Sequence, residues 1–291
     1  MARSKQRTGP VGYRPGIGTK GSRVLLVVFL SVLALVFLIP FYLILRNALA
    51  TDAEITAPDW MWFSPAPAWD NFTKLFSDPA VPMARSLLNS AIVAVLTTVG
   101  TLFLCTTAGY GLARIPYRHA NKVFYAVLAT LMIPGAITFV PSFVMVSSLG
   151  WLSDYRGLII PGLFSGFAAF LCRQYFLSFP RELEEAARVD GLGYWGAFWR
   201  IVIPNSGSFL AAVAVITFVG AWNSFLWPLV IGRSPDSWTV QVALSTFLTA
   251  QTISISQLFM AALVAITPLV FVFLFLQRFL VQGVAQTGLK G

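Results

Sequence analysis

The chain has 291 residues, of which 57% are hydrophobic and 11% are charged. A soluble domain carries about 25% charged residues, so this composition excludes a soluble globular protein and indicates a helical integral membrane protein. The formal net charge of +9 does not indicate a nucleic-acid-binding protein, because the basic residues cluster at the ends of apolar runs and form no basic domain.

Residues 1–23 form a basic tail that is rich in Gly and Pro, and we expect it to be disordered and cytoplasmic. The apolar run that begins at Val24 is about 22 residues long, which exceeds the apolar region of a signal peptide. No small-residue cleavage site follows it. We therefore expect this run to stay in the mature protein as a signal anchor.

Six apolar runs are each about 20 residues long, enough to cross a hydrocarbon core of about 30 Å as helices. The sequence therefore predicts an all-α polytopic membrane protein whose six transmembrane helices form one domain over residues 24–291. Pro134 and Pro141 in the third run, and Pro268 in the sixth, predict kinks. The spans are predicted at residues 24–45, 87–112, 123–145, 158–176, 207–230 and 258–280.

The distribution of Lys and Arg predicts the orientation of these spans. Fifteen of these residues lie in the N-terminal tail, in the loops 113–122 and 173–204, and at the C-terminal end, whereas five lie in the other loops. Loops with an excess of Lys and Arg stay in the cytoplasm. Both termini and the loop between the fourth and fifth spans are therefore expected to be cytoplasmic.

The residues needed for catalysis are missing from the sequence. No Gly-Lys dipeptide occurs, so the chain has no Walker A motif and should not hydrolyse ATP itself. The single histidine, His119, lies in a short basic loop and is expected to be solvated. Cys105 and Cys172 lie in apolar runs and predict neither a disulfide framework nor a metal site. The chain is not expected to be an enzyme.

The loop 177–205 has the residue types of two short helices. Ser178 and Pro180 suit the start of a helix, acidic residues follow in its first turns, and Gly191 suits its end. A second helix can run from Tyr194 to Ile201. An amphipathic connector on the membrane surface would explain the aromatic residues, but not an alanine pair beside three glutamates. Small side chains permit close approach by a partner protein.

The spacing of this loop fits the pattern E-A-A-x3-G-x9-I-x-L-P, except that Ile203 replaces the leucine. The loop resembles the cytoplasmic EAA motif of ABC-importer permeases. The matching residues are Glu185, Ala186, Ala187, Gly191, Ile201 and Pro204.

Other segments extend the resemblance over almost the whole chain, to the carbohydrate-uptake branch of the binding-protein-dependent permeases. Two departures are glycines at two alanine positions of the pattern A-A-Y-A-L-A-R, and Ser224 in place of an acidic residue. The matching segments are 88–93, 108–114, 131–134, 221–229, 277–283 and 288–291.

The resemblance implies a type I ABC-importer permease fold in a bacterial or archaeal cytoplasmic membrane. It implies a subunit of an ATP-driven importer for a sugar or sugar-like solute. Its partners would be a second permease, usually a different chain, two ATPase subunits and an external solute-binding protein. ATP and Mg²⁺ would be bound by the ATPase subunits, and this chain would hold no cofactor.

The resemblance also implies roles for particular residues. A coupling element would bind the ATPases, so replacing Glu185 or Gly191 should uncouple transport without preventing insertion. The C-terminal residues Gly288, Lys290 and Gly291 would also contact the ATPases. The implied coupling residues are Glu184, Glu185, Ala186, Ala187, Arg188, Asp190, Gly191, Ile201 and Pro204.

The polar residues of the spans are candidates for a solute pathway. No span carries a charged residue near its middle, which favours a neutral polar solute and argues against a proton-coupled carrier. Hydrogen bonding between helices is the competing interpretation for each residue. The pathway candidates are Asn89, Thr138, Ser142, Trp222 and Asn223, from a wider set that adds Ser90, Thr97, Thr98, Thr101, Ser165, Thr217 and Ser224.

Other functions stay open. The same kind of permease could carry glycerol phosphate, a polyamine or an amino acid. In a stand-alone secondary carrier the EAA pattern would be accidental, and co-purification with an ATPase distinguishes that class. The sequence does not determine the solute or whether the pore is a homodimer or a heterodimer.

Overall fold

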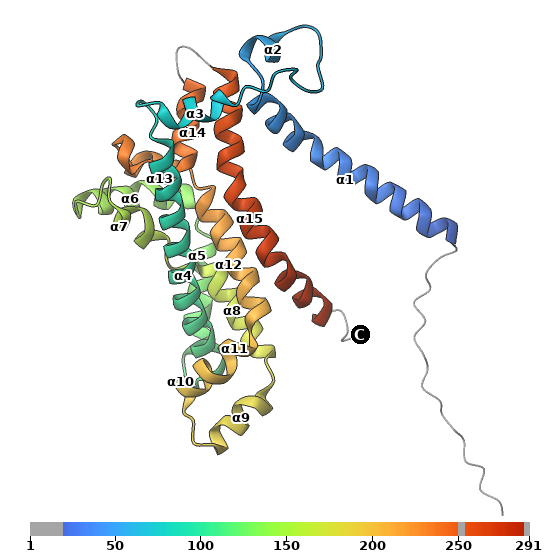
Figure 1. The fold of residues 1–291 in the computed structure, drawn as a ribbon. Coiled ribbons are helices and arrows are strands. Elements are labelled where there is room, and N and C mark those ends of the chain that lie inside the picture. The colour runs from blue at the N-terminus through green and yellow to red at the C-terminus, as the bar shows by residue number, and fades with distance from the viewer. Residues whose placement is uncertain (1–19, 250–253, 288–291) are drawn as a thin grey trace, which may run out of the picture.

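The computed structural model describes residues 20–249 and 254–287, and every regular element within them is a helix (Figure 1). This result confirms the all-α fold class. The elements are α1 (Lys20–Ala48), α2 (Asp52–Thr56), α3 (Asp70–Ser77), α4 (Met83–Arg114), α5 (Ala120–Leu131), α6 (Gly135–Ser148), α7 (Tyr155–Ile159), the 3-10 turn η1 (Ile160–Gly162), α8 (Gly166–Ser178), α9 (Arg181–Val189), α10 (Tyr194–Ala197), the π-helical turn η2 (Phe198–Val202), α11 (Ile203–Asn205), α12 (Gly207–Trp222), α13 (Leu226–Ile231), η3 (Pro235–Ser237), α14 (Val240–Thr249) and α15 (Ile255–Thr287).

The described helices supply three to six candidate membrane spans. Helices α1, α4 and α15 are each long and apolar enough to cross a membrane alone. Three bent pairs pass the same test: α5 with α6, α7–η1 with α8, and the α10–α11 segment with α12, bent by 96°, 44° and 81°. If each pair is one span, the total is six, which is the number that the sequence predicts.

The third predicted span, 123–145, is divided between α5 and α6 at Pro134, which precedes the first residue of α6. Proline removes a backbone N–H and disfavours helical conformation in the residue before it, so α5 cannot continue through Ile133. The predicted kink is therefore a break. Pro141 and Pro268, by contrast, lie inside helices that continue past them.

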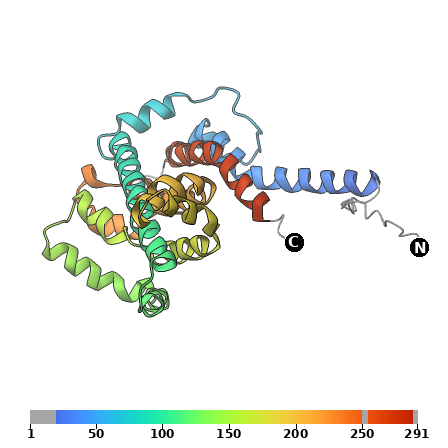
Figure 2. The same ribbon diagram turned by 90° about the horizontal axis from the view of Figure 1, so that it is seen from below.

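Helix α4 is the centre of the molecule, because α8 and α12 both pack along it (Figures 1 and 2). One buried cluster lies at the end that carries residues 177–205, which we call the loop end. There Tyr110 of α4 contacts Phe176 of α8 and Phe198 of η2, with ring centroids 5.7 and 4.9 Å apart. The helix that reaches the loop end is thus packed directly against the loop.

At the opposite end of the molecule, short segments are held against α4 by buried hydrogen bonds. Asn89 is 1% exposed, and its amide donates to the carbonyl oxygens of Asp236 and Trp238, both at 2.8 Å. Its side-chain oxygen accepts from Tyr155 at 2.6 Å. These contacts fix the polypeptide that connects α13 to α14 against the first turns of α4.

Helix α1 stands apart from the other helices in both views (Figures 1 and 2). Its described residues from Gly21 to Phe41 are all exposed, and burial begins only near Arg46. Ala48 joins a buried cluster with Met260, Ala261 and Ala265 of α15. The helix is therefore attached to the body through its C-terminal end.

Candidate functional site: a hydroxyl-lined cavity and the loop 177–205

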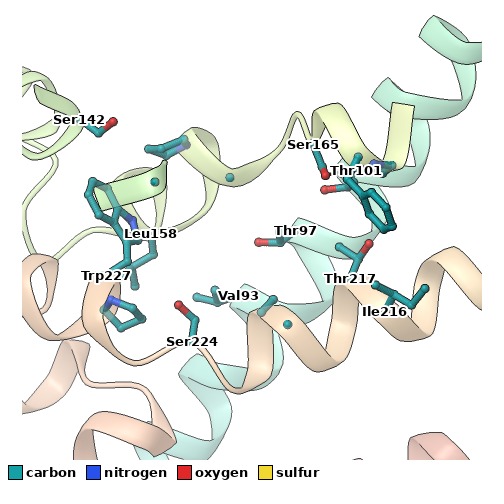
Figure 3. Close-up of a pocket in the computed structure, with 18 of the residues that line it drawn as sticks. Val93, Thr97, Thr101, Ser142, Leu158, Ser165, Ile216, Thr217, Ser224 and Trp227 are labelled. Carbon is teal, nitrogen blue, oxygen red and sulfur yellow. Dashed lines mark hydrogen bonds between the residues drawn. The ribbon is translucent and has the colours of Figure 1, made fainter. Parts of the chain in front are cut away.

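A cavity of about 490 Å³ lies between α4, α6, α8, α12 and α13 (Figure 3). The break at Pro134 and the end of α12 at Trp222 contribute to it, because the segments that follow them carry part of the lining. The hydroxyl-bearing residues that line it are Thr97, Thr101, Thr138, Ser142, Ser165, Thr217 and Ser224.

Two features of this lining determine its chemistry. The lining residues in the described part of the chain include no Asp, Glu, Lys, Arg or His. Two aromatic rings, Phe139 and Trp227, lie edge to face with centroids 5.7 Å apart, and the indole N–H of Trp227 donates to the carbonyl oxygen of Gly157 at 3.0 Å. Hydroxyl groups beside an aromatic surface suit an uncharged molecule that has both hydroxyls and an apolar face.

Thr101 is notable within the lining. Its side chain is 1% exposed, and its hydroxyl has no hydrogen-bond partner within the described residues. A buried hydroxyl without a partner costs about 1–3 kcal/mol. On the same helix, Thr98 donates to the carbonyl oxygen of Ala94 at 2.7 Å and does not line the cavity. Thr101 is therefore the lining residue most in need of a polar partner.

Of the five pathway candidates, two line the cavity and three do not. Thr138 and Ser142 line the cavity. Asn89 does not, because its amide is used in the contacts at the opposite end. Trp222 is 2% exposed and donates to the carbonyl oxygen of Ala265 at 3.1 Å, so it holds α12 against α15. Asn223 is exposed outside the lining and accepts from Gln241 at 3.2 Å.

Sequence reasoning overlooked the aromatic residues of the cavity, which are Phe139, Phe167 and Trp227. Trp227 was not among the pathway candidates, and Phe139 has the character of any apolar residue of its span. The signal that could have found Trp227 is its place after the break at Asn223 to Phe225, since irregular backbone within a membrane is tolerated where it is buried in protein or lines a cavity.

The loop 177–205 begins with α9, whose residues divide into an exposed and a buried set. The side chains of Glu185, Ala186, Arg188 and Asp190 are exposed, whereas Ala187 is 4% exposed and packs inward. The sequence predicted this helix and its end at Gly191, which has a φ of +82°. The exposed part of the predicted coupling element thus forms one face that other molecules can reach.

Glu184 is placed differently from its neighbour Glu185. Its residue is 4% exposed, and its carboxylate forms an ion pair with Arg114 of α4 at 2.9 Å. The sequence grouped Glu184 with the coupling residues that face a partner, but its carboxylate is engaged within this chain. The loop is joined to α4 through this residue.

The second half of the loop is irregular. The predicted helix from Tyr194 to Ile201 is divided into α10 and the π-helical turn η2. Ile201 is half-buried in this turn, and Pro204 is exposed in α11. The predicted contact residues Gly288, Lys290 and Gly291 lie outside the described residues.

The described residues contain no cluster of three His, Cys, Asp or Glu side chains that could hold a metal ion. Cys105 and Cys172 are both buried and unpaired, and His119 is partly exposed in its loop. None of these residues lines the cavity.

The sequence is similar to permeases of known transport systems. Residues 105–286 match the family described as "Binding-protein-dependent transport system inner membrane component". AraQ, the arabinooligosaccharides transport system permease protein of Bacillus subtilis (strain 168), is 32% identical, over 92% of this chain and 96% of that relative. UgpE, the sn-glycerol-3-phosphate transport system permease protein of Yersinia pestis bv. Antiqua (strain Antiqua), is 31% identical over 89% and 95%.

Two further proteins extend the comparison. LacG, the lactose transport system permease protein of Rhizobium radiobacter, is 32% identical over 87% of this chain and 92% of the relative. A chain in the crystal structure of a bacterial ABC transporter involved in the import of the acidic polysaccharide alginate has the same fold. The TM-score is 0.78 at 21% identity, over 91% of this chain and 99% of that chain.

The family match and the permease relatives define a permease of the ABC-importer type, and the likeness to the solved chain shows the same fold. The chain belongs to the family of binding-protein-dependent transport system inner membrane components. It is a membrane-embedded permease subunit, as the sequence predicts.

Proposed function

We propose that this permease imports a neutral sugar or oligosaccharide, and that the cavity forms its half of the solute pathway. The observation that carries the proposal is a lining of seven hydroxyl residues and three aromatic rings without a charged group among the described residues. Sugars present hydroxyls on their edges and an apolar ring face, which match these two kinds of lining. The names of AraQ and LacG support a saccharide.

Glycerol phosphate is the second candidate solute, because UgpE is 31% identical to this chain. A phosphate monoester carries about −1.5 to −2 charges and is recognised by Arg, Lys or clustered backbone N–H groups. The absence of Arg and Lys from the cavity lining favours the neutral solute.

The complete transporter consists, in this proposal, of this chain, a second and different permease, two ATPase subunits and an external solute-binding protein. ATP and Mg²⁺ are bound by the ATPase subunits, and this chain holds no cofactor. The Lys and Arg distribution supports an orientation with both termini and the loop 177–205 in the cytoplasm. The exposed face of α9 is then where an ATPase binds.

The proposal is tested with the complete transporter in proteoliposomes that contain ATP. Radiolabelled maltose, lactose, arabinobiose and glycerol 3-phosphate are supplied together with the cognate binding protein. ATP-dependent uptake of a neutral saccharide, without competition by excess glycerol 3-phosphate, is the expected result. Uptake of glycerol 3-phosphate alone would overturn the assignment of a neutral solute, and uptake independent of ATP would indicate a secondary carrier.

Thr101→Val tests the cavity. Removing the hydroxyl relieves an unpaired buried group, so we expect equal or higher thermal stability of the purified transporter. In this proposal the enclosed hydroxyl reaches the solute when the lining moves during transport, so loss of that hydrogen bond should raise the KM for uptake by about 5–10-fold, as expected for about 1–1.5 kcal/mol. The control is Thr98→Val, which removes a hydroxyl outside the lining. Equal uptake kinetics in both variants would show that Thr101 does not contact solute.

Glu185→Lys tests the binding of the ATPase. Glu185 is exposed and has no ion-pair partner among the described residues, so the substitution should leave the fold intact. We expect the variant to insert normally but to retain less ATPase on affinity purification, and Glu185→Gln to fall between it and the wild type. Retention of the ATPase at the wild-type level by Glu185→Lys would contradict this role.

A further inference from the structure

A buried ionic cluster connects α9 to the end of α4. The Nε atom of Arg114 lies 2.9 Å from the Oε1 atom of Glu184, and each side chain is 5% exposed. The hydroxyl of Tyr110 donates to the other carboxylate oxygen of Glu184 at 3.0 Å, and Arg114 donates to the carbonyl oxygen of Phe179. We call Tyr110, Arg114 and Glu184 the ionic cluster.

Burying the ionic cluster costs desolvation free energy, so its position in the fold calls for an explanation other than stability. Removing a carboxylate and a guanidinium from water carries a desolvation penalty that their attraction often only offsets, and apolar side chains of similar size often give equal stability. A contribution to stability is therefore a weak reason for burying this pair. The ion pair fixes the distance between α9 and α4, and the hydrogen bonds of Tyr110 to Glu184 and of Arg114 to Phe179 add direction, which an apolar contact lacks.

Helix α4 leads from the cluster to the cavity without a break. It is continuous from Met83 to Arg114 and carries Val93, Thr97 and Thr101 of the lining. The 13 residues from Thr101 to Arg114 span about 20 Å at 1.5 Å per residue. A displacement of α9 that moves Arg114 is thus delivered to one wall of the cavity by a single helix.

We propose that Glu184 and Arg114 are positioning residues that make α9 and α4 move as one unit during transport. This inference rests on the proposed function, because it assumes that an ATPase moves α9. Glu185 and its exposed neighbours receive that movement in this scheme, and the adjacent Glu184 transmits it to α4. Two consecutive glutamates thus have different tasks, one toward the partner and one toward the cavity.

The link can be measured directly by pulsed electron paramagnetic resonance. Spin labels are placed at Leu183→Cys, outside the predicted coupling residues of α9, and at Tyr117→Cys, whose native residues are 44% and 57% exposed. The native Cys105 and Cys172 are 0% exposed and should not be labelled. In the complete transporter, the distance distribution between the labels reports how tightly α9 is held relative to the end of α4.

The test variants are Glu184→Gln and the double variant Glu184→Leu/Arg114→Met, with Glu182→Gln as the control at an exposed position of the same helix. The double variant replaces the ion pair by apolar side chains that fill the site, so it remains informative if the single variant does not fold. We expect both test variants to broaden the distance distribution. We also expect about tenfold less solute transported per ATP hydrolysed, which is within the usual range of coupling between sites.

A distance distribution in the double variant that matches the wild type would overturn the proposal, as would an unchanged ratio of transport to ATP hydrolysis. If Glu184 and Arg114 had a purely structural role, both quantities should stay unchanged, since the apolar pair maintains packing. Failure of the proposed function has a different signature. In that case the wild-type transporter would not move a neutral saccharide, while the distance measurement would still report on the link.

Discussion

Gly109→Ala is expected to destabilise the protein more than any other single methyl group added to a described glycine of α4. A Cβ atom at this position would lie 2.5 Å from the Cβ of Cys172, 2.8 Å from the backbone nitrogen of Arg173 and 2.9 Å from the carbonyl carbon of Cys172. These atoms belong to the α8 backbone or its first side-chain atom, so none can rotate away. Helices α4 and α8 must move apart.

The expected cost is about 1–3 kcal/mol, the usual range for overpacking a core. The measurement is the thermal unfolding midpoint of the purified transporter, together with the amount of chain in the membrane. Gly111→Ala is the matched control, because a Cβ there meets nothing within 4 Å. That change should be neutral or stabilising by up to about 1 kcal/mol, since alanine favours helix over glycine. Equal midpoints for the two variants would contradict the close approach.

Gly191→Val should abolish most transport while leaving the transmembrane helices intact. Gly191 has a φ of +82°, and its backbone N–H donates to the carbonyl oxygen of Arg188 at 3.0 Å. Leu192 then donates to the carbonyl oxygen of Ala187 at 2.9 Å, so the two bonds close the end of α9. A Cβ atom at this position would meet nothing within 4 Å, so we expect the substitution to act through backbone strain.

A side chain at a left-handed position costs about 1–2 kcal/mol, or about a 5–30-fold change in population. The penalty is largest for a β-branched residue such as Val, whereas Asn tolerates this conformation. We therefore expect uptake per unit of membrane-inserted chain to fall about tenfold for Gly191→Val and less for Gly191→Asn. Similar uptake in the two variants would show that the backbone at the end of α9 is unimportant for coupling.

The sequence was sufficient for the features that depend on local chemistry. Long apolar runs predicted the helical class, and the glycine at position 191 predicted where α9 ends. The break at Pro134 was anticipated only as a kink. A proline within an apolar run can bend a helix or end it, depending on whether neighbours stabilise the freed carbonyls. Helices α6 and α15 continue past Pro141 and Pro268, whereas Pro134 lies at the break between α5 and α6. The sequence does not distinguish these two outcomes.

Contacts between segments that are distant in the chain could not be predicted from the sequence. The polar character of Asn89 and Trp222 suggested the solute pathway, yet both make hydrogen bonds to residues more than 40 positions away. Glu184 and Glu185 are adjacent and chemically identical. Their opposite environments follow from the packing of α9 on α4, which fixes one face of the helix inward. No pattern within the loop encodes that choice of face.

The attachment of α1 has a consequence for the synthesis of the protein. The residues that hold its end, Met260, Ala261 and Ala265, belong to the last helix. At a synthesis rate of about 5–20 residues per second, the roughly 200 residues between α1 and α15 take about 10–40 s to appear. Throughout that interval α1 must remain inserted without its partner helix. Its continuous apolar surface from Val24 to Phe41 lets lipid alone hold it there until the chain is finished.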